Sequence, residues 1–343
     1  MRNPDLLIDE LYATVAKWHG KRVLVFGDMI LDEYIFGNTS RVSREAPVVI
    51  VRYDSSSFNM GGAANAAQNI AALGGNAIAV GFVGNDGSGE QLKQLMSERG
   101  VSIRSVVTLA GRYTTTKMRI MAGDYHAQRQ QMVRIDREQD IPIDSREENR
   151  LLSAFKRELR RSDAVILSDY HQAIFTENVI RKSIEMCRRA GVPVIADSRF
   201  HLHVFRGVTT ATPNEVEAAA AVGMDLCGED TVERAGRKLL KMLASSSVLI
   251  TRGRFGMSLL ERGKKIHSVD VVGTREATDV TGAGDTVASA VALTLAAGGS
   301  MFIAMHLANI AASIVVMKRG TAIADTGEIL ATIEEMSRRS TTG

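Results

Sequence analysis

Cysteine is scarce in this sequence of 343 residues, which contains only Cys187 and Cys227. Two cysteines without Cys-x-x-Cys spacing give neither a disulfide framework nor a zinc-binding pattern, and they fit a reducing cytoplasm. Long runs of one charge sign are also absent, and the formal net charge is only +3. The short basic segments 157–161 and 338–339 have the pattern of solvated helix faces, so we expect no nucleic-acid partner.

Long apolar runs are missing as well. Residues 1–20 carry charged side chains among their apolar ones, at Asp5, Asp9, Glu10 and Lys17. This pattern excludes a signal-peptide core or a membrane span and predicts an amphipathic surface helix. The Walker pattern is absent too, and residues 81–84 lack the spacing of a dinucleotide fingerprint, which disfavours P-loop and Rossmann nucleotide sites.

Short apolar strands alternate with helical segments through most of the chain. The predicted strands are 22–26, 78–82, 164–167, 192–196, 209–211 and 247–251. The predicted helices are 61–73, 89–99, 146–161, 176–190, 231–243 and 284–296. Such alternation is typical of an α/β fold, with a mostly parallel central sheet covered by helices on both faces.

Two regions, 34–53 and 112–134, contain strand patterns without intervening helices. We interpret them as a small β lid inserted into a single domain that spans residues 1–343. A lid suits phosphoryl transfer, because its closure excludes the water that would compete for the phosphate.

The most informative segment is Thr-Asp-Val-Thr-Gly-Ala-Gly-Asp-Thr at 278–286, directly before the apolar helical run 287–296. Glycines at a helix entrance leave backbone N–H groups free, and the helix dipole adds positive potential, so the turn can hold an anion. Asp285 fits beside it as the acceptor of a hydroxyl proton. The alternative interpretation is an ordinary capped helix start.

Residues 279–285 resemble the C-terminal signature of the ribokinase-like, or PfkB, superfamily, and Gly-Gly-Ala-Ala-Asn-Ala-Ala at 61–67 resembles its N-terminal one. The resemblance implies a ribokinase-like sugar kinase in which Asp285 is the general base. The backbone that would stabilise the transferred phosphoryl group belongs to Gly282, Ala283 and Gly284.

Residues 212–217 resemble the Asn-x-x-Glu element of the same superfamily. By this resemblance Asn214 and Glu217 order Mg²⁺ through water, a role that suits their hard oxygen atoms. Taken alone, the pattern is that of a helix cap with an acidic first turn. The nucleotide-binding residues implied for ATP are Asn214, Glu217, Thr251, Gly253, Gly256 and Asn309.

The acceptor side begins where the first predicted strand ends, the position at which open α/β sheets bind ligands. Asp28 and Asp32 lie there and can each bind sugar hydroxyls. Gly61 and Gly62 remove side chains from the pocket floor, and the Asn65 amide both donates and accepts hydrogen bonds. This set predicts a polyol-binding site.

Four further segments resemble the bacterial kinases of D-glycero-D-manno-heptose 7-phosphate, namely 37–48, 116–119, 133–136 and 167–170. This resemblance, which extends from about Arg22 to Thr326, implies transfer of the γ-phosphate of ATP to the anomeric hydroxyl of that heptose. The product would be the 1,7-bisphosphate, a step toward ADP-heptose for lipopolysaccharide core. A phosphorylated substrate requires cations in its pocket. Arg44, Lys117, Arg119 and Arg134 are the candidates, with Lys117 first, and Asp169 and Asp197 complete the predicted substrate site.

The sequence departs from the heptose kinase pattern at Arg44, where that family has a proline, and at Gln172 and Arg199, where it has lysines. Two alternatives therefore stay open. One is a ribokinase-like kinase for another sugar or a nucleoside, and the other is an inactive sensor of sugar or nucleotide. We also expect a homodimer through the lid, because exposed strand edges favour pairing, and no adenylyltransferase domain such as the bifunctional relatives carry.

Overall fold

The computed structural model describes residues 4–123, 129–138, 141–273 and 276–341. Its centre is a parallel six-stranded sheet in the order β10-β9-β8-β1-β4-β5. Along the chain these strands are β1 (Arg22–Gly27), β4 (Asn76–Gly84), β5 (Ser102–Leu109), β8 (Ala164–Asp169), β9 (Val194–Ser198) and β10 (Thr210–Ala211). An antiparallel sheet, made of β11 (Ser247–Thr251), β12 (Met257–Glu261) and β13 (His267–Val269), adjoins β10. A backbone hydrogen bond from Thr251 to Pro213 joins the two sheets.

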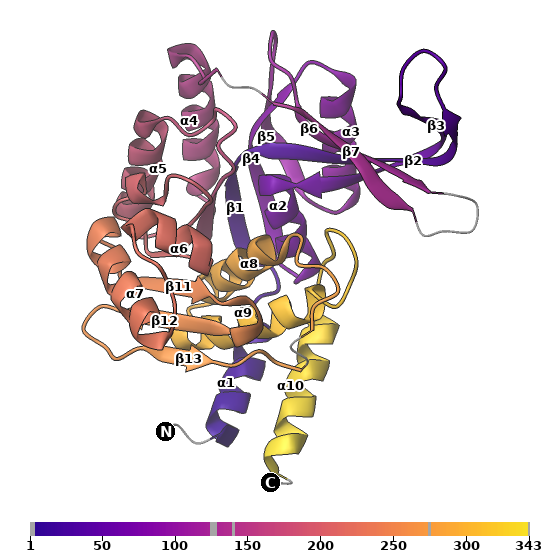
Figure 1. Cartoon of the computed structure of the whole chain (residues 1–343). Coiled ribbons are helices and arrows are strands. Elements are labelled where there is room, and N and C mark those ends of the chain that lie inside the picture. Colours follow the sequence, from indigo (N-terminus) through magenta and orange to yellow (C-terminus); the bar gives the residue numbers. More distant parts are fainter. Residues whose placement is uncertain (1–3, 124–128, 139–140, 274–275, 342–343) are drawn as a thin grey trace.

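Helices cover both faces of the central sheet, as Figure 1 shows. Successive strand side chains point to opposite faces, so Val23 and Val25 enter one core while Leu24 and Phe26 enter the other. The first core is closed by α1 (Pro4–Val15), α2 (Gly62–Ala72), α3 (Gly87–Glu98), α8 (Ala283–Ala296), α9 (Met301–Val315) and α10 (Thr326–Thr341). The second is closed by α4 (Ser145–Leu159), α5 (Glu177–Ala190), α6 (Glu215–Val222) and α7 (Glu229–Leu243). The predicted α/β architecture is confirmed.

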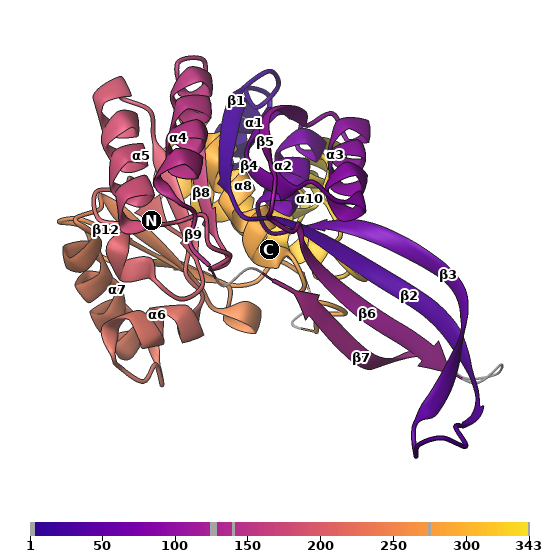
Figure 2. The same cartoon turned by 90° about the horizontal axis from the view of Figure 1, so that it is seen from above.

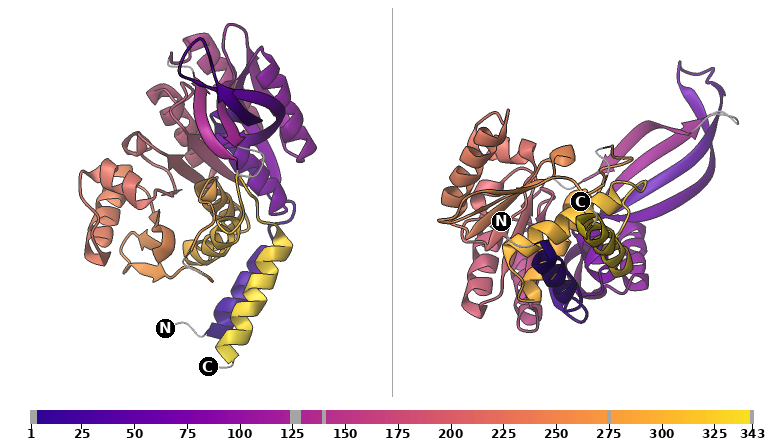
Figure 3. Two further views of the ribbon diagram at one scale, coloured as in Figure 1. Left: turned by 45° about the vertical axis from the view of Figure 1, so that its right-hand side comes forward. Right: turned by 90° about the horizontal axis from the view of Figure 1, so that it is seen from below.

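The first and last helices lie side by side and extend away from the sheets (Figures 1 and 3). Leu11 and Val15 of α1 are fully buried in the same core as Ile329 and Ile333 of α10. The N-terminal helix predicted from the sequence is therefore present, but its apolar side is covered by the chain's own C-terminal helix. Across the described ranges, we find no helix that is both long and apolar enough to cross a membrane.

Four long strands form a second sheet that projects from the body (Figure 2). Its order is β3-β2-β6-β7, made of β2 (Met29–Val42), β3 (Val49–Gly61), β6 (Thr115–Gly123) and β7 (Gln130–Arg137). The predicted lid ranges 34–53 and 112–134 lie largely within it. The first range extends further than predicted at both ends, because β2 follows β1 after a single residue and β3 continues directly into α2, so the sequence has no linker to mark a boundary. In the second range the strands begin later, at Thr115, and end later, at Arg137.

Candidate active site

Asp285 lies in the first turn of α8 and is only 3% exposed. The turn before it depends on Gly282, whose φ of +81° is a left-handed conformation that glycine adopts without strain. No side chain caps this helix end. The N–H of Ala283 donates to the carbonyl of Val280 (3.2 Å), whereas no described group accepts the N–H of Gly282, Gly284 or Asp285. The turn can therefore bind an anion.

Both oxygens of the Asp285 carboxylate accept a hydrogen bond. The amide of Asn65, from α2, donates to Oδ2 (2.6 Å), and the hydroxyl of Tyr170, from the loop after β8, donates to Oδ1 (3.0 Å). Burial raises the pKa of Asp285 to about 6, even though both hydrogen bonds and the charge of Arg199 act in the opposite direction. A carboxylate with that pKa is ionised at neutral pH and is a stronger base than a free aspartate.

Asp32, at the root of the lid, forms an ion pair with Arg119 of β6, with 2.6 Å between Oδ1 and Nη1. The predicted need for glycine beside it is explained by two close approaches. A Cβ added to Gly61 would lie 2.7 Å from Asp32 Oδ2, and one added to Gly62 would lie 2.6 Å from the carbonyl oxygen of Asp28. The start of α2 can thus lie against β2 and bring Asn65 to Asp285.

Asp28 and Asp169 are buried carboxylates that order the loop after β8. Asp28 Oδ2 accepts the N–H of Tyr170 (2.8 Å) and of Gln172 (3.2 Å), while Asp169 accepts the N–H of His171 (2.9 Å) and the Ser198 hydroxyl (2.7 Å). Burial and the neighbouring charge of Asp169 raise the pKa of Asp28 to about 7. Both Asp169 oxygens and Asp28 Oδ2 accept from the protein's own groups, while the buried Asp28 Oδ1 has no partner among the described residues. Sugar contacts by these two residues stay predictions.

The lid cations share one face of their sheet. Strand register places Lys117 between Asp32 of β2 and Asp136 of β7. The three predicted phosphate ligands on the lid strands already have acidic partners: Arg119 pairs with Asp32, Lys117 with Asp136 (3.5 Å) and Glu138, and Arg134 with Asp136 (2.7 Å). The structure brings the predicted residues together, and a bound phosphate would have to exchange with these carboxylates. Arg44 is exposed in the turn between β2 and β3.

This lid face is directed toward the turn that carries the base. Although burial alone would raise it, the pKa of Asp279 is lowered by hydrogen bonds from the backbone of Thr281 and Gly320 and by the charge of Arg119. Both of those bonds are 2.9 Å long. Asp279 thereby fastens the glycine turn to the loop after α9, a role that the sequence reasoning missed but that an Asp two residues before a turn can signal.

Asn214 and Glu217 form a reciprocal cap at the start of α6. Asn214 Oδ1 accepts the N–H of Glu217 (2.8 Å), and Glu217 Oε2 accepts the N–H of Asn214 (2.9 Å). Burial raises the pKa of Glu217, and burial beside Asp285 and Glu217 raises the pKa of Asp197 well above its usual range. Asp197 is thus repelled by the charges of two neighbouring carboxylates. Within the described residues no group of three His, Cys, Asp or Glu side chains could hold a metal ion. The oxygens of Asn214 and Glu217 are of the kind that bind Mg²⁺ through water, and that role stays a prediction.

The remaining predicted nucleotide residues lie around the loop that follows β11. Thr251 is the last residue of that strand. Gly253 begins a short 3-10 turn, 253–255, and a Cβ on Gly256 would lie 1.9 Å from the carbonyl oxygen of Val269, so only glycine fits there. Asn309 of α9 donates its amide to the carbonyl of Asp270 (2.7 Å). These contacts hold the loop, the end of β13 and α9 together, and direct contact of these residues with ATP stays a prediction.

Arg199, which follows β9, was noted only as a departure from a family pattern. Its guanidinium carbon lies 4.4 Å from the centre of the Tyr170 ring. Tyr170 was noted only as the last residue of the segment 167–170. Sequence reasoning gave neither residue a role, because their importance comes from the positions that folding gives them beside Asp285.

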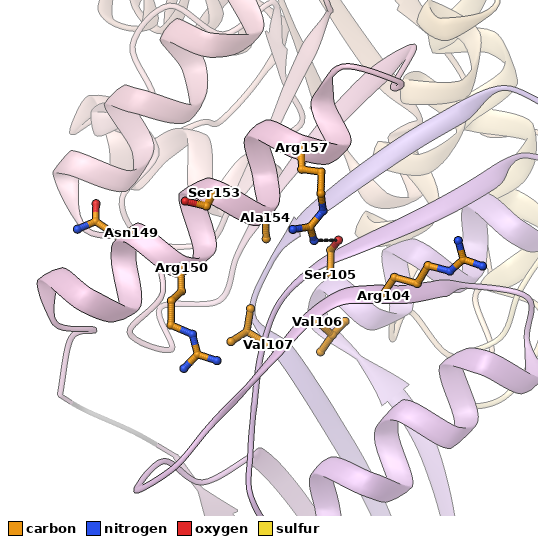
Figure 4. A pocket seen from close by; sticks show the side chains of 9 residues that line it. All are labelled: Arg104, Ser105, Val106, Val107, Asn149, Arg150, Ser153, Ala154 and Arg157. Carbon is orange, nitrogen blue, oxygen red and sulfur yellow. Dashed lines mark hydrogen bonds between the residues drawn. The ribbon is translucent and has the colours of Figure 1, made fainter.

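A separate groove of about 420 Å³ lies between α4 and the edge strand β5 (Figure 4). Arg104, Arg150 and Arg157 line it, and Arg157 donates to the Ser105 hydroxyl (2.7 Å). The basic segment 157–161, predicted to be a solvated helix face, thus contributes to a groove wall. None of the site residues described above lines it.

Comparison with known proteins identifies the chain's relatives. Residues 21–326 match the model of the pfkB family carbohydrate kinases. The chain belongs to this family. The predicted kinase class and the use of ATP follow from that membership.

Among curated proteins, the bifunctional protein HldE of Bradyrhizobium diazoefficiens is 36% identical over 330 residues, 96% of this chain and 65% of the relative. HldE of Caulobacter vibrioides is 40% identical over 315 residues, 91% of this chain and 63% of the relative. The chain therefore spans about two thirds of the length of these relatives.

Among solved structures, Arabidopsis thaliana ribokinase in complex with ribose and ATP superposes with a TM-score of 0.72 at 20% identity, over 92% of this chain and 99% of that one. Escherichia coli phosphofructokinase-2 with substrates and products gives 0.73 at 18% identity, over 93% and 100%. These two likenesses confirm the ribokinase-like fold.

Proposed function

We propose that this chain transfers the γ-phosphoryl group of ATP to the anomeric hydroxyl of D-glycero-D-manno-heptose 7-phosphate, in the cytoplasm. The proposal is supported by the lid motifs at 37–48 and 116–119, by the HldE relatives, and by the family's chemistry. The observation that carries it is the buried Asp285 carboxylate, oriented by Asn65 and Tyr170 beside an open glycine turn.

The transfer uses Asp285 as the base. Its carboxylate accepts the proton of the acceptor hydroxyl as the hydroxyl oxygen bonds to the γ-phosphorus and the bond from that phosphorus to the β–γ bridging oxygen breaks, which releases ADP. The N–H groups of Gly282 and Gly284 hold the charge that develops on the transferred group. Mg²⁺ offsets the phosphate charge when bound, and Asn214 and Glu217 would order its water shell.

The lid supplies the acceptor site. Asp32 binds sugar hydroxyls while Arg119 holds its carboxylate, and Lys117 exchanges its acidic partners for the 7-phosphate. When a lid cation binds the phosphate, its carboxylate partner loses an ion pair. Binding of the phosphorylated substrate therefore changes the ion pairs that hold the lid strands, and so links substrate binding to the position of the lid.

A panel of acceptors with Mg²⁺ and ATP tests the proposal. We expect turnover of heptose 7-phosphate, with little or none of unphosphorylated heptose, ribose or adenosine. Turnover of ribose or adenosine without turnover of the heptose 7-phosphate would assign the chain to another member of the family.

We further propose that the chain forms a homodimer through its lid. Apolar side chains on the lid strands and their connecting turn are exposed, at Val42, Val48, Val49, Tyr53, Val133 and Ile135. Exposed apolar side chains at these positions favour burial against a second copy. Light scattering is expected to give twice the monomer mass for the parent and for Val216→Asp, a change at an exposed site on α6, but the monomer mass for Val49→Asp. A monomeric parent would contradict the proposal.

A further inference from the structure

Tyr170 is held at Asp285 from three directions. Its own N–H donates to Asp28 Oδ2 (2.8 Å), and the next N–H along the chain, that of His171, donates to Asp169 Oδ1 (2.9 Å). Arg199 lies over the ring, with its guanidinium carbon 4.4 Å from the ring centre. Two buried carboxylates thus fix the backbone, and one cation fixes the ring, of a side chain whose hydroxyl donates the 3.0 Å hydrogen bond to Asp285 Oδ1.

The phenol donates to the Asp285 carboxylate in this position. Burial, followed by the charges of Asp285 and Asp197, raises the pKa of Tyr170 well above its usual range. The hydroxyl therefore keeps its proton at neutral pH and is not the base. A donor bonded to a carboxylate stabilises the ionised form, which is the form that a base needs.

The guanidinium group of Arg199 suits its position over the Tyr170 ring. Its planar guanidinium stacks on an aromatic ring, which the ammonium group of a lysine cannot do. Burial would lower the pKa of Arg199, but the negative groups around it, including Asp285 and Asp197, outweigh burial and keep it charged. The cation thus fixes the ring and also favours the ionised carboxylate.

We propose that Tyr170, held by Arg199, is a positioning residue for the base: together with Asn65 it fixes the plane of the Asp285 carboxylate and keeps it ionised. The proposal rests on the assigned role of Asp285 in the transfer. A carboxylate oxygen accepts more than one hydrogen bond, so Oδ1 retains a lone pair for the acceptor hydroxyl while Tyr170 stays bonded.

The test uses Tyr170→Phe, which removes the hydroxyl and keeps the ring under Arg199. The matched control is Tyr113→Phe, because Arg137 lies over the Tyr113 ring in the same manner (4.2 Å) at an exposed position. Carboxyl-carbon NMR titration of the unliganded protein, with the Asp285 signal assigned by its loss in Asp285→Asn, measures the base directly. The charged or titratable groups facing it are Asp32 of β2, Asp197 of β9, Arg199 directly after β9, and Tyr170.

We expect the Asp285 titration to move up by about one pH unit in Tyr170→Phe, because a hydrogen bond to the charged form is lost. The acid limb of kcat should move with it, and kcat at neutral pH should fall about 10-fold, while KM for ATP and the titration in Tyr113→Phe stay unchanged. Arg199→Met, which keeps the hydroxyl, should give a smaller upward shift, and it serves as the test if Tyr170→Phe does not fold. An Asp285 titration that stays at its parent position in both variants would overturn the proposal. The NMR measurement needs no substrate, so a wrong acceptor assignment would appear only as a parent enzyme without turnover.

Discussion

At the scale of single residues, the proposed role of Asp285 is to accept one proton from the acceptor hydroxyl. Asp285→Asn keeps the hydrogen bond from Asn65 possible but removes the base, so we expect kcat to fall by about 10²–10⁴-fold. Calorimetry should show ATP binding close to that of the parent. The control is Asp9→Asn, at an exposed position on α1, and near-normal turnover of Asp285→Asn would contradict the assignment.

Asp28 has a predictable effect on stability. Its pKa is about 7 in the folded protein, against about 3.9 for a free aspartate. The folded state therefore binds a proton that the unfolded state has released between these values, and stability falls as the pH rises through this window. Asp28→Asn does not titrate. Relative to the parent, it should gain about 2 kcal/mol in the free energy of unfolding between pH 5 and pH 8, measured with urea. An equal difference at both pH values would show that Asp28 does not titrate in this range.

Ala173 adopts a conformation that suits glycine, with φ at +72°. The left-handed region costs a residue with a Cβ roughly 1–2 kcal/mol, so we expect Ala173→Gly to raise the free energy of unfolding by about 1 kcal/mol. The same substitution at Ala13, exposed within α1, should lower it by a similar amount. Thermal unfolding of both variants checks that the two changes in stability have opposite signs. Destabilisation by Ala173→Gly would show that contacts of the Ala173 Cβ stabilise the protein by more than the left-handed conformation costs.

At the scale of elements, the start of α8 separates two glycines that look alike in the sequence. A Cβ on Gly282 would meet a left-handed φ and lie 2.8 Å from Asn65 Nδ2, whereas a Cβ on Gly284 has no neighbour within 4 Å. Gly282→Ala should therefore lose roughly 1–2 kcal/mol of stability and disturb the bond from Asn65 to Asp285. Gly284→Ala, inside the helix, should keep the parent's melting temperature, and equal losses in both would contradict this account.

The lid offers a second test at this scale. If Lys117 binds the 7-phosphate, Lys117→Met should raise KM for the phosphorylated acceptor about 10- to 100-fold, since a hydrogen bond to a charged group contributes roughly 1.5–3 kcal/mol. KM for ATP should not change. Lys93→Met, which breaks the ion pair with Glu90 on α3, is the matched control. An unchanged acceptor KM would transfer the role to Arg134 or Arg119.

At the scale of the whole molecule, the fold could be predicted because its strands are buried on both faces and so appear as unbroken apolar segments. The predicted strand 247–251 has the bounds of β11, and the predicted strand 22–26 falls one residue short of β1. The late elements were harder. Helix α9 is buried along most of its length, so its sequence lacks the polar stripe that reveals a surface helix.

The residues of the candidate site also fall into two groups, those that sequence motifs revealed and those that only the structure revealed. The two glycine motifs revealed Asp285 and Asn65, which lie 220 positions apart and meet through a 2.6 Å hydrogen bond. The segment 167–170 was singled out for its resemblance to the heptose kinases, but the role of Tyr170 beside Asp285 was missed, because its partner is 115 positions away and no spacing rule joins the two residues. The acidic partners of Lys117 were missed for a similar reason, since they depend on strand register rather than on sequence pattern.

The pairing of α1 with α10 joins two elements that are made at different times. Leu11 and Val15 of α1 are synthesised well before Ile329 and Ile333 of α10, yet all four side chains lie in one core. Because synthesis runs from the N-terminus, the apolar side of α1 stays unburied by α10 until the sheets and helices between them have been made. Helix α1 thus reaches its final packing after those elements have been synthesised.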